Sequence, residues 1–201
     1  MNDLAEGTTV LGRNCGRCSL CCKLLRVDPL EKPEGQWCKH CKPGTGCQIY
    51  ADRPELCATF MCAWLSAADL GDHWEPLKSK MVMFADGNDN CIGIHVEPST
   101  PNRWRDEPYY SDIKRIAMSA ADHQGRVCIY IKHRAIVVLP NKEVDLGVVE
   151  AGDHIMVGEL NVPFGRDWDA FVRKAADIPE DERDKWIVMS GRRASELDPK
   201  R

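Results

Sequence analysis

The sequence predicts an α+β protein: a cysteine-rich, metal-tied N-terminal region of turns and short helices, followed by a small, mostly antiparallel sheet with helices on one face. Three observations support this prediction. Nine of the eleven cysteines lie between residues 15 and 62. After residue 80, short runs alternate apolar and polar residues as strands do, and one longer stretch repeats apolar residues at helical spacing. When helices pack on one face of an antiparallel sheet, the apolar side chains of both the strands and the helices are buried between them.

The composition is that of a globular protein and argues against several classes of function. Of the 201 residues, 43% are hydrophobic and 29% are charged, and the net charge is -4. This balance gives no general attraction to nucleic acid or to an anionic membrane. No apolar run reaches the roughly 18 residues that cross a bilayer, and the first residues lack a secretory pattern. We therefore expect a cytoplasmic protein, in whose reducing surroundings clustered cysteines bind metal rather than form disulfides.

Residues 1–14 are polar and predict a flexible N-terminal segment. Residues 15–79 form the cysteine-rich region, where frequent prolines and glycines disfavour long helices and strands. A short helix is expected after Arg53, because Pro54 suits the first helical position and Glu55 complements the helix dipole. Apolar residues at helical spacing over 56–70 predict a contact between this region and the rest of the chain.

Residues 80–165 predict an α+β layer. The turn-rich segment 86–90 separates two expected strands, over 80–85 and 91–96. A helix is expected from residue 107 to a stop at Gly125, because Ile113, Ile116 and Ala117 fall on one helical face. Further strands are expected over 127–131, 135–139, 144–149 and 154–160.

Residues 166–201 predict C-terminal helices followed by a polar tail. Trp168, Phe171 and Val172 have the spacing of a short amphipathic helix, and a second helix is expected over 180–189. We expect all four segments of the chain to form one compact unit.

The clustered cysteines have the spacing of metal ligands. The first four form C-x2-C-x2-C-C, a second C-x2-C follows, and three more stand singly. Thiolate is the preferred ligand of zinc, copper(I) and iron–sulfur clusters, and a two-residue gap lets one tight turn present two sulfurs to one ion. The expected metal-binding residues are Cys15, Cys18, Cys21, Cys22, Cys38, Cys41, Cys47, Cys57 and Cys62.

The spacing leaves the sharing of ligands open. A structural zinc site commonly uses two C-x2-C knuckles, and Cys38 with Cys41 can combine with either of two overlapping pairs in the first motif. Cys21 and Cys22 are neighbours that point in different directions, so they are expected to serve different ions or to bridge them. The nine sulfurs fit two mononuclear sites with one spare, a bridged multinuclear site, or an iron–sulfur cluster with additional thiols.

The other candidate residues have simpler interpretations. Cys91 and Cys128 lie in apolar strand patterns and are expected in the core. His40 lies inside the second knuckle, a position that usually faces solvent, so it is not expected to bind the metal. Four cations surround the first motif and either offset the negative charge of a thiolate centre or form ordinary solvated surface: Arg13, Arg17, Lys23 and Arg26.

No motif of a known catalytic class is found in the sequence. It lacks the nucleophile elbow, the phosphate-binding loop, the paired histidines of zinc proteases and the dinucleotide fingerprint. An enzymatic role is therefore disfavoured, although it is not settled.

Two stretches of the cysteine-rich region resemble the CxxCxxCC family, the YkgJ-type cysteine cluster proteins described as zinc- or iron-chelating. The first is Cys15-x2-Cys18-x2-Cys21-Cys22, and the second runs from Gly46 to Cys62 as G-C-Q-I-Y-x2-R-P-x2-C-x2-F-x-C. The resemblance implies that the nine cysteines are the metal-binding set, and it implies no settled reaction. A flagellin lysine methylase carries a similar cysteine motif, which extends the possible roles to an enzyme or an iron–sulfur protein.

We expect a metal-binding protein in which zinc, held by clustered thiolates, organises the N-terminal half. Residues 15–62 contain too few large apolar side chains to fold without such ligation. The alternative is an iron–sulfur protein in electron transfer or protein modification, and a third role is metal trafficking with exchangeable ions. Metal ions are the expected partners, a protein partner is left open, and neither nucleic acid nor a membrane is indicated.

Overall fold

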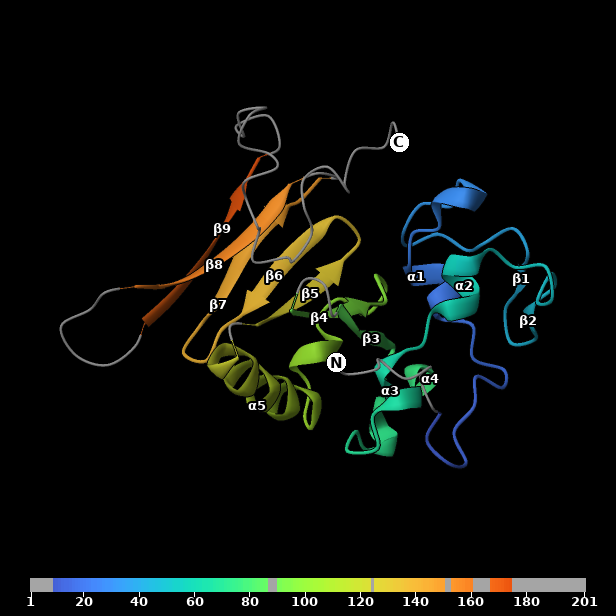
Figure 1. The fold of residues 1–201 in the computed structure, drawn as a ribbon, viewed down its shortest axis with the longest axis horizontal. Coiled ribbons are helices and arrows are strands. Elements are labelled where there is room, and N and C mark those ends of the chain that lie inside the picture. Colours follow the sequence, from blue (N-terminus) through green and yellow to red (C-terminus); the bar gives the residue numbers. More distant parts are fainter. Residues whose placement is uncertain (1–8, 87–89, 124, 151–152, 161–166, 175–201) are drawn as a thin grey trace, which may run out of the picture. The chain divides into compact units, whose positions relative to one another are not determined.

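The computed structural model describes residues 9–86, 90–123, 125–150, 153–160 and 167–174. Figure 1 shows the ribbon of the chain, which divides into two units. Each unit has its own hydrophobic core. The first unit comprises residues 1–84 and 95–106, and the second comprises residues 85–94 and 107–201. The expected α+β class is confirmed, because both helices and antiparallel strands are present.

The first unit is built from short elements joined by turns, as its prolines and glycines predict. Its helices are α1 (Cys21–Leu24), α2 (Glu55–Thr59), α3 (Ala63–Ser66) and α4 (Pro76–Ser79), with 3-10 turns η1 (Asp28–Leu30), η2 (Asp72–Trp74) and η3 (Arg103–Arg105). Strands β1 (Cys41–Lys42) and β2 (Gly46–Cys47) form a small antiparallel hairpin. The expected helix after Arg53 is α2, although Pro54 precedes it as the N-cap and Glu55 is its first residue.

The core of the first unit joins the cysteine-rich region to strand β3 (Met81–Asp86). Leu20 and Leu24 from the α1 segment pack with Leu65 of α3 and with Val82 of β3. Cys62 is 9% exposed and belongs to the same cluster. Because these side chains come from three separate segments, their packing fixes the positions of the cysteines between them.

The larger sheet has the strand order β3-β4-β5-β6-β7. Strands β4 (Cys91–Val96), β5 (Arg126–Ile131), β6 (Arg134–Val138) and β7 (Glu143–Val148) follow β3, and the unit boundary crosses both β3 and β4. β5 and β6 pair antiparallel through a two-residue loop, in which Lys132 has φ of 52°. A positive φ is what the tight turns of two-residue hairpins require.

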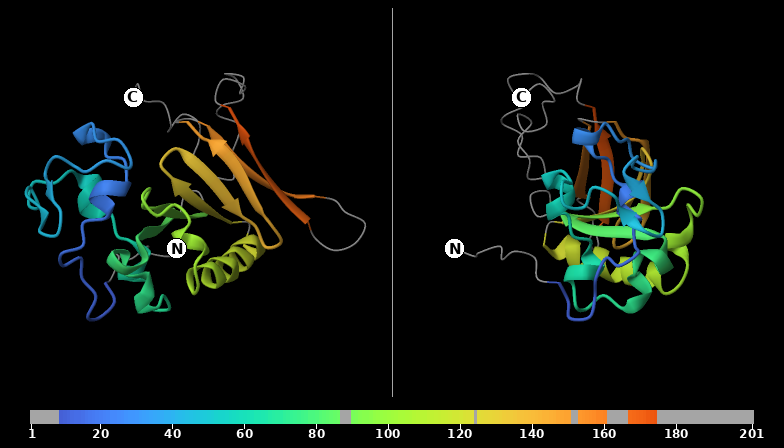
Figure 2. Two further views of the ribbon diagram at one scale, coloured as in Figure 1. Left: turned by 180° about the vertical axis from the view of Figure 1, so that it is seen from behind. Right: turned by 90° about the vertical axis from the view of Figure 1, so that its right-hand side faces the viewer.

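The second unit buries both faces of β5 and β6. One face carries the buried residues Val127 and Ile129. The two strands contact helix α5 (Tyr109–Asp122), whose buried residues recur every four positions. The other face, with Cys128 and Val137, packs against the hairpin of β8 (His154–Leu160) and β9 (Asp167–Arg173), which Figure 2 shows beside β7. Cys91 and Cys128 are 5% and 0% exposed, so their expected place in the core is confirmed.

The segment from Asp167 to Arg173 was expected to be a helix, and this prediction is wrong. It forms β9, which pairs with β8 in an unbroken antiparallel register from His154 opposite Arg173 to Leu160 opposite Asp167. The apolar residues at helical spacing also fit a strand that is buried mainly at Ala170, so tertiary pairing decided the outcome. The helix expected over 180–189 lies outside the described residues. Within the described ranges, no helix is long and apolar enough to span a membrane.

Candidate metal centre

The first cysteine motif is a tight turn followed by helix α1. The Cys18 amide donates a 2.7 Å hydrogen bond to the Cys15 carbonyl, which closes the turn between the two thiols. Gly16 makes this turn possible with φ of 45°, and a Cβ there would lie 2.9 Å from Asn14 Oδ1. Cys21 and Cys22 then begin α1, and their side chains hydrogen-bond to each other.

The second motif is a similar turn that leads into the β1–β2 hairpin. The Cys41 amide donates a 2.9 Å hydrogen bond to the Cys38 carbonyl, and Cys41 then lies directly opposite Cys47 in the hairpin. Gly44 in the connecting loop and Gly46 at the start of β2 have φ of 75° and 109°. The hairpin therefore presents two thiols, in addition to that of Cys38, from a single short stretch.

One backbone contact brings the two motifs together. The Cys38 amide donates a 3.0 Å hydrogen bond to the carbonyl of Cys22, and the Gly35 amide donates a 3.2 Å bond to Leu24. The chain between the motifs thus folds back along α1. The two remaining single cysteines lie close by in sequence: Cys57 is in α2 and Cys62 is the N-cap of α3.

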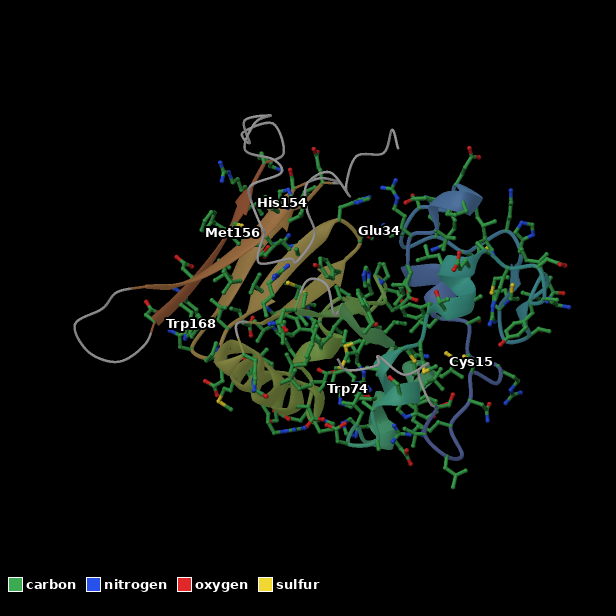
Figure 3. All side chains as sticks on the ribbon, in the orientation of Figure 1. Cys15, Glu34, Trp74, His154, Met156 and Trp168 are labelled. Carbon is green, nitrogen blue, oxygen red and sulfur yellow. The ribbon has the colours of Figure 1, made fainter. Side chains whose placement is uncertain are left out.

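Five of the thiols form what we call the hairpin group: Cys22, Cys38, Cys41, Cys47 and Cys57. The side chain of Cys22 hydrogen-bonds to that of Cys41. The Cys57 thiol lies within electrostatic range of Cys22, Cys38 and Cys47. Cys38 and Cys41 are thus grouped with Cys22 rather than with the first turn. In Figure 3, yellow sulfur atoms gather beside α2 and the β1–β2 hairpin.

Three further thiols form the turn group: Cys15, Cys18 and Cys62. Cys18 interacts electrostatically with both of the others, and Cys62 does so with Cys15, which is labelled in Figure 3. Cys21 lies between the groups, since it hydrogen-bonds to Cys22 and packs with Cys18 on the core around Cys62. All nine cysteines that the sequence singles out are therefore in the first unit, eight of them in two neighbouring groups and Cys21 between the two.

The pKa values of six of these thiols are raised. A hydrogen bond with Cys21, and then burial, hold the pKa of Cys22 far above its ordinary value. Burial, followed by the nearby Cys22, raises the pKa of Cys41 to about 11. Burial likewise raises the pKa of Cys15, Cys18, Cys57 and Cys62. Without metal, such thiols stay protonated at neutral pH and are poor nucleophiles, because the thiolate is the reactive form.

A buried lysine beside the hairpin group was not anticipated from the sequence. Lys32 is only 5% exposed, and its ammonium donates to the carbonyls of Lys23, at 2.8 Å, and of Leu25. Burial lowers the pKa of Lys32, whereas the neighbouring thiols Cys22 and Cys38 act in the opposite direction. In the sequence, Lys32 lies one short loop after the first motif, and this position does not predict that its side chain is buried.

A second unanticipated cation is Arg53, which interacts electrostatically with both groups through Cys15 and Cys57. Its guanidinium also lies 3.8 Å from the centre of the Tyr50 ring. The cations expected around the first motif have other partners. Arg13 donates to the carbonyls of Trp64, Ala67 and Leu70 at the end of α3, at 2.7, 2.9 and 2.5 Å.

Lys23 and Arg26, which were also expected beside the thiols, form ion pairs with carboxylates. Lys23 forms a 2.7 Å ion pair with Glu97, and Arg26 pairs with Asp28. Arg17 is exposed. Three of the four expected cations are therefore ion-paired, since the Arg13 guanidinium also lies 3.8 Å from a carboxylate oxygen of Asp72. Arg13 in addition holds the backbone of the first unit together.

The chemistry of the donors fits a soft or borderline metal, but the side chains do not surround a common point. Among the described residues, no group of three or more cysteine, histidine, aspartate or glutamate side chains is placed so that it could hold an ion. The Cys22 thiol instead hydrogen-bonds to those of Cys21 and Cys41, as neutral groups do. His40 contributes its carbonyl to a hydrogen bond with Gln48.

Comparison with known proteins yields no relative. No protein-family model matches the chain, and neither a curated protein nor a solved structure does so. The resemblance to the CxxCxxCC proteins therefore rests on the two cysteine motifs alone.

Proposed function

We propose that this protein binds zinc through the clustered thiolates of its first unit, and that the ions hold this unit together. The observation that carries the proposal is the hydrogen bond from the Cys38 amide to the Cys22 carbonyl, which brings two ligand motifs side by side. Two closed C-x2-C turns meet there, and such turns are the usual way in which a chain presents a pair of sulfurs to one zinc ion.

We assign the thiols to two sites. Cys21 completes the turn group to a set of four, with Cys15, Cys18 and Cys62. The hairpin group supplies a second set of four from its five members, with one thiol in excess. Because four thiolates hold one structural zinc ion, roughly two ions per chain are expected. This is the two-site arrangement with a spare that the spacing allows.

Binding requires a modest rearrangement of side chains. Cys22 hydrogen-bonds to Cys21 and Cys41, and each liganding thiol must lose its proton and turn its sulfur toward the ion. Zinc, when bound, would neutralise thiolates and cross-link the segments around α1, α2 and the hairpin.

The buried cations support a negatively charged centre. A zinc ion with four thiolates carries two negative charges, and Lys32 and Arg53 lie beside the groups that would form it. A buried ammonium is costly unless an anion faces it. Neutral thiols offer Lys32 little compensation, whereas thiolates on zinc would offset its charge.

Electrostatic interaction between the turn group and the hairpin group favours an alternative function, an iron–sulfur centre in electron transfer or protein modification. Cys15 and Cys22 belong to different groups and still interact electrostatically. Thiols shared across groups suit a multinuclear centre better than two separate ions. Elemental analysis and a visible spectrum of anaerobically purified protein separate the two: zinc gives no colour, whereas an iron–sulfur cluster is brown.

Other aspects of the proposal follow from the same residues. We propose a non-enzymatic role, because the thiols with raised pKa values are unsuited to act as nucleophiles. We also propose a cytoplasmic location and kinship with the CxxCxxCC proteins. Clustered cysteines that bind metal as thiolates suit a reducing compartment.

A further inference from the structure

We propose that the β1–β2 hairpin is a thiol-oxidation site, at which a peroxide joins Cys41 and Cys47 in a disulfide. The bond would remove two ligands from the hairpin group and so release its metal. The first statement stands on the geometry of the hairpin alone. The second rests on the proposed function.

The register of the hairpin places the two residues as a disulfide requires. Cys41 is the direct partner of Cys47, and the Gln48 amide donates a 2.8 Å hydrogen bond to the His40 carbonyl. Hydrogen-bonded and non-hydrogen-bonded pairs alternate along an antiparallel ladder, so Cys41 and Cys47 form a non-hydrogen-bonded pair. Cα atoms in such pairs are about 4.5 Å apart, within the roughly 4.4 to 6.8 Å span of disulfides.

Cys22 is the main competitor for Cys41, because the two side chains already hydrogen-bond. When no metal is bound, the entropy of loop closure favours a bond from Cys41 to Cys47 over one from Cys41 to Cys22. Five residues separate Cys41 from Cys47, whereas eighteen separate Cys22 from Cys41. Since closure probability falls as loop length to the power three-halves, the shorter loop is favoured about sevenfold. The backbone ladder adds to this by holding the two strands opposite each other.

Both thiols can be reached by a small oxidant, since Cys41 and Cys47 are partly exposed. The reaction balances in two steps. Because burial raises the pKa of Cys41 and slows its reaction with free oxidants, hydrogen peroxide oxidises Cys47 to a sulfenic acid, with loss of one water molecule, directly opposite Cys41 in the hairpin. The second thiol attacks that sulfur, the S–O bond breaks as the S–S bond forms, and a second water molecule leaves. Two thiols are oxidised, and one peroxide is reduced.

The sequence around the hairpin makes the bond easy to detect. Trypsin cuts after Lys39 but not before Pro43, and a protease that cuts before aspartate cleaves ahead of Asp52. Together they release residues 40–51, which contain Cys41 and Cys47 and no other cysteine. Protein that has been stripped of metal, reduced and freed of reductant is treated with hydrogen peroxide, alkylated and digested. The disulfide makes this peptide two hydrogens lighter and resistant to alkylation.

Two variants test the assignment. Cys47→Ser is expected to abolish the modified peptide, and the matched variant Cys57→Ser, which removes another thiol of the hairpin group, is expected to leave its yield within about twofold. A bond from Cys41 to Cys22, or a loss of the product in Cys57→Ser, would overturn the proposal. The wild-type peptide gives this answer even if a variant folds poorly.

Metal release is measured separately, on protein saturated with zinc, with a chromogenic zinc indicator. We expect zinc to appear in step with the disulfide and to return to the protein after reduction. Disulfide formation with full zinc retention would refute the link to metal. A protein that takes up no zinc before oxidation would refute the proposed function, and the metal-free digestion would still decide whether Cys41 and Cys47 are the oxidation site.

Discussion

The Cys38 amide donates a 3.0 Å hydrogen bond to the carbonyl of Cys22, although fifteen residues separate them in the sequence. This bond joins the turn that begins the second cysteine motif to helix α1, which ends the first. The thiols of Cys22 and Cys41 are in contact as a consequence. The two motifs therefore lie side by side in the proposed metal centre.

Replacing a thiol of this centre is expected to reduce bound zinc. Cys15→Ser and Cys18→Ser each remove one of the four thiols of the turn site, which has no spare, so each should lose about one zinc ion per chain or bind it far more weakly. Zinc content after gel filtration, measured by elemental analysis, checks this. Cys91→Ala serves as the matched control, because Cys91 is a buried core residue of the second unit. Equal loss in the control would show that the effect is general destabilisation.

Lys32→Met is expected to weaken zinc binding roughly tenfold, because it removes a buried positive charge beside the thiolates. The control is Lys39→Met, since Lys39 lies within the second knuckle but is exposed. Competition with a chelator of known affinity measures both variants. If Lys32→Met and Lys39→Met bind zinc alike, the buried ammonium does not stabilise the centre.

Arg13→Ala is expected to lower the free energy of unfolding of the first unit by about 2 kcal/mol, because it leaves the Trp64, Ala67 and Leu70 carbonyls without their charged donor. The matched variant is Arg17→Ala, which removes an exposed cation and should change stability little. Urea unfolding followed by fluorescence compares them. Similar stabilities for the two variants would mean that the Arg13 contacts are replaced by water without loss.

Stability is expected to fall between pH 6.5 and about 4 because of His95. Burial, and then the charge of Lys32, lower the pKa of His95 from 6.5 to about 4. The His95 ring stacks on the Phe84 ring, with 5.6 Å between the ring centres. In this window the unfolded chain binds the proton and the folded chain does not, so stability is complete above pH 6.5 and decreases as the pH falls.

The histidine contribution is isolated by comparison with His95→Gln. Between pH 7 and pH 5, the wild-type protein should lose about 1 kcal/mol more than the variant, a value reduced to allow for the partial exposure of the ring. Unfolding in urea at the two pH values supplies both differences, and effects shared with the cysteines cancel. Equal losses in the two proteins would exclude His95 as the cause.

Much of the fold could be predicted because local patterns and tertiary structure agree. Alternating apolar residues predicted strands β5 and β6, and a one-sided apolar face predicted helix α5. Most ends of these three elements were predicted to within two residues. The segment of β9 could not be predicted in the same way. Its apolar residues suit a helix or a strand equally, and only pairing with β8 decides between them.

The candidate site was only partly predictable. Sequence spacing identified the nine thiols and the two C-x2-C turns, because these are local properties. It could not show that Cys38 meets Cys22, since that contact depends on how residues 23–37 fold back. It also missed Lys32, whose burial results from carbonyl groups at the end of α1 that a sequence does not reveal as neighbours.

The most direct test of the account is the metal content and visible spectrum of the full chain, purified without oxygen and without added metal. We predict colourless protein with roughly two zinc ions per chain, which loses its folded structure when a strong chelator removes them. Brown protein that contains iron would instead support the iron–sulfur alternative. Protein that holds no metal and keeps its fold in the chelator would contradict the central claim.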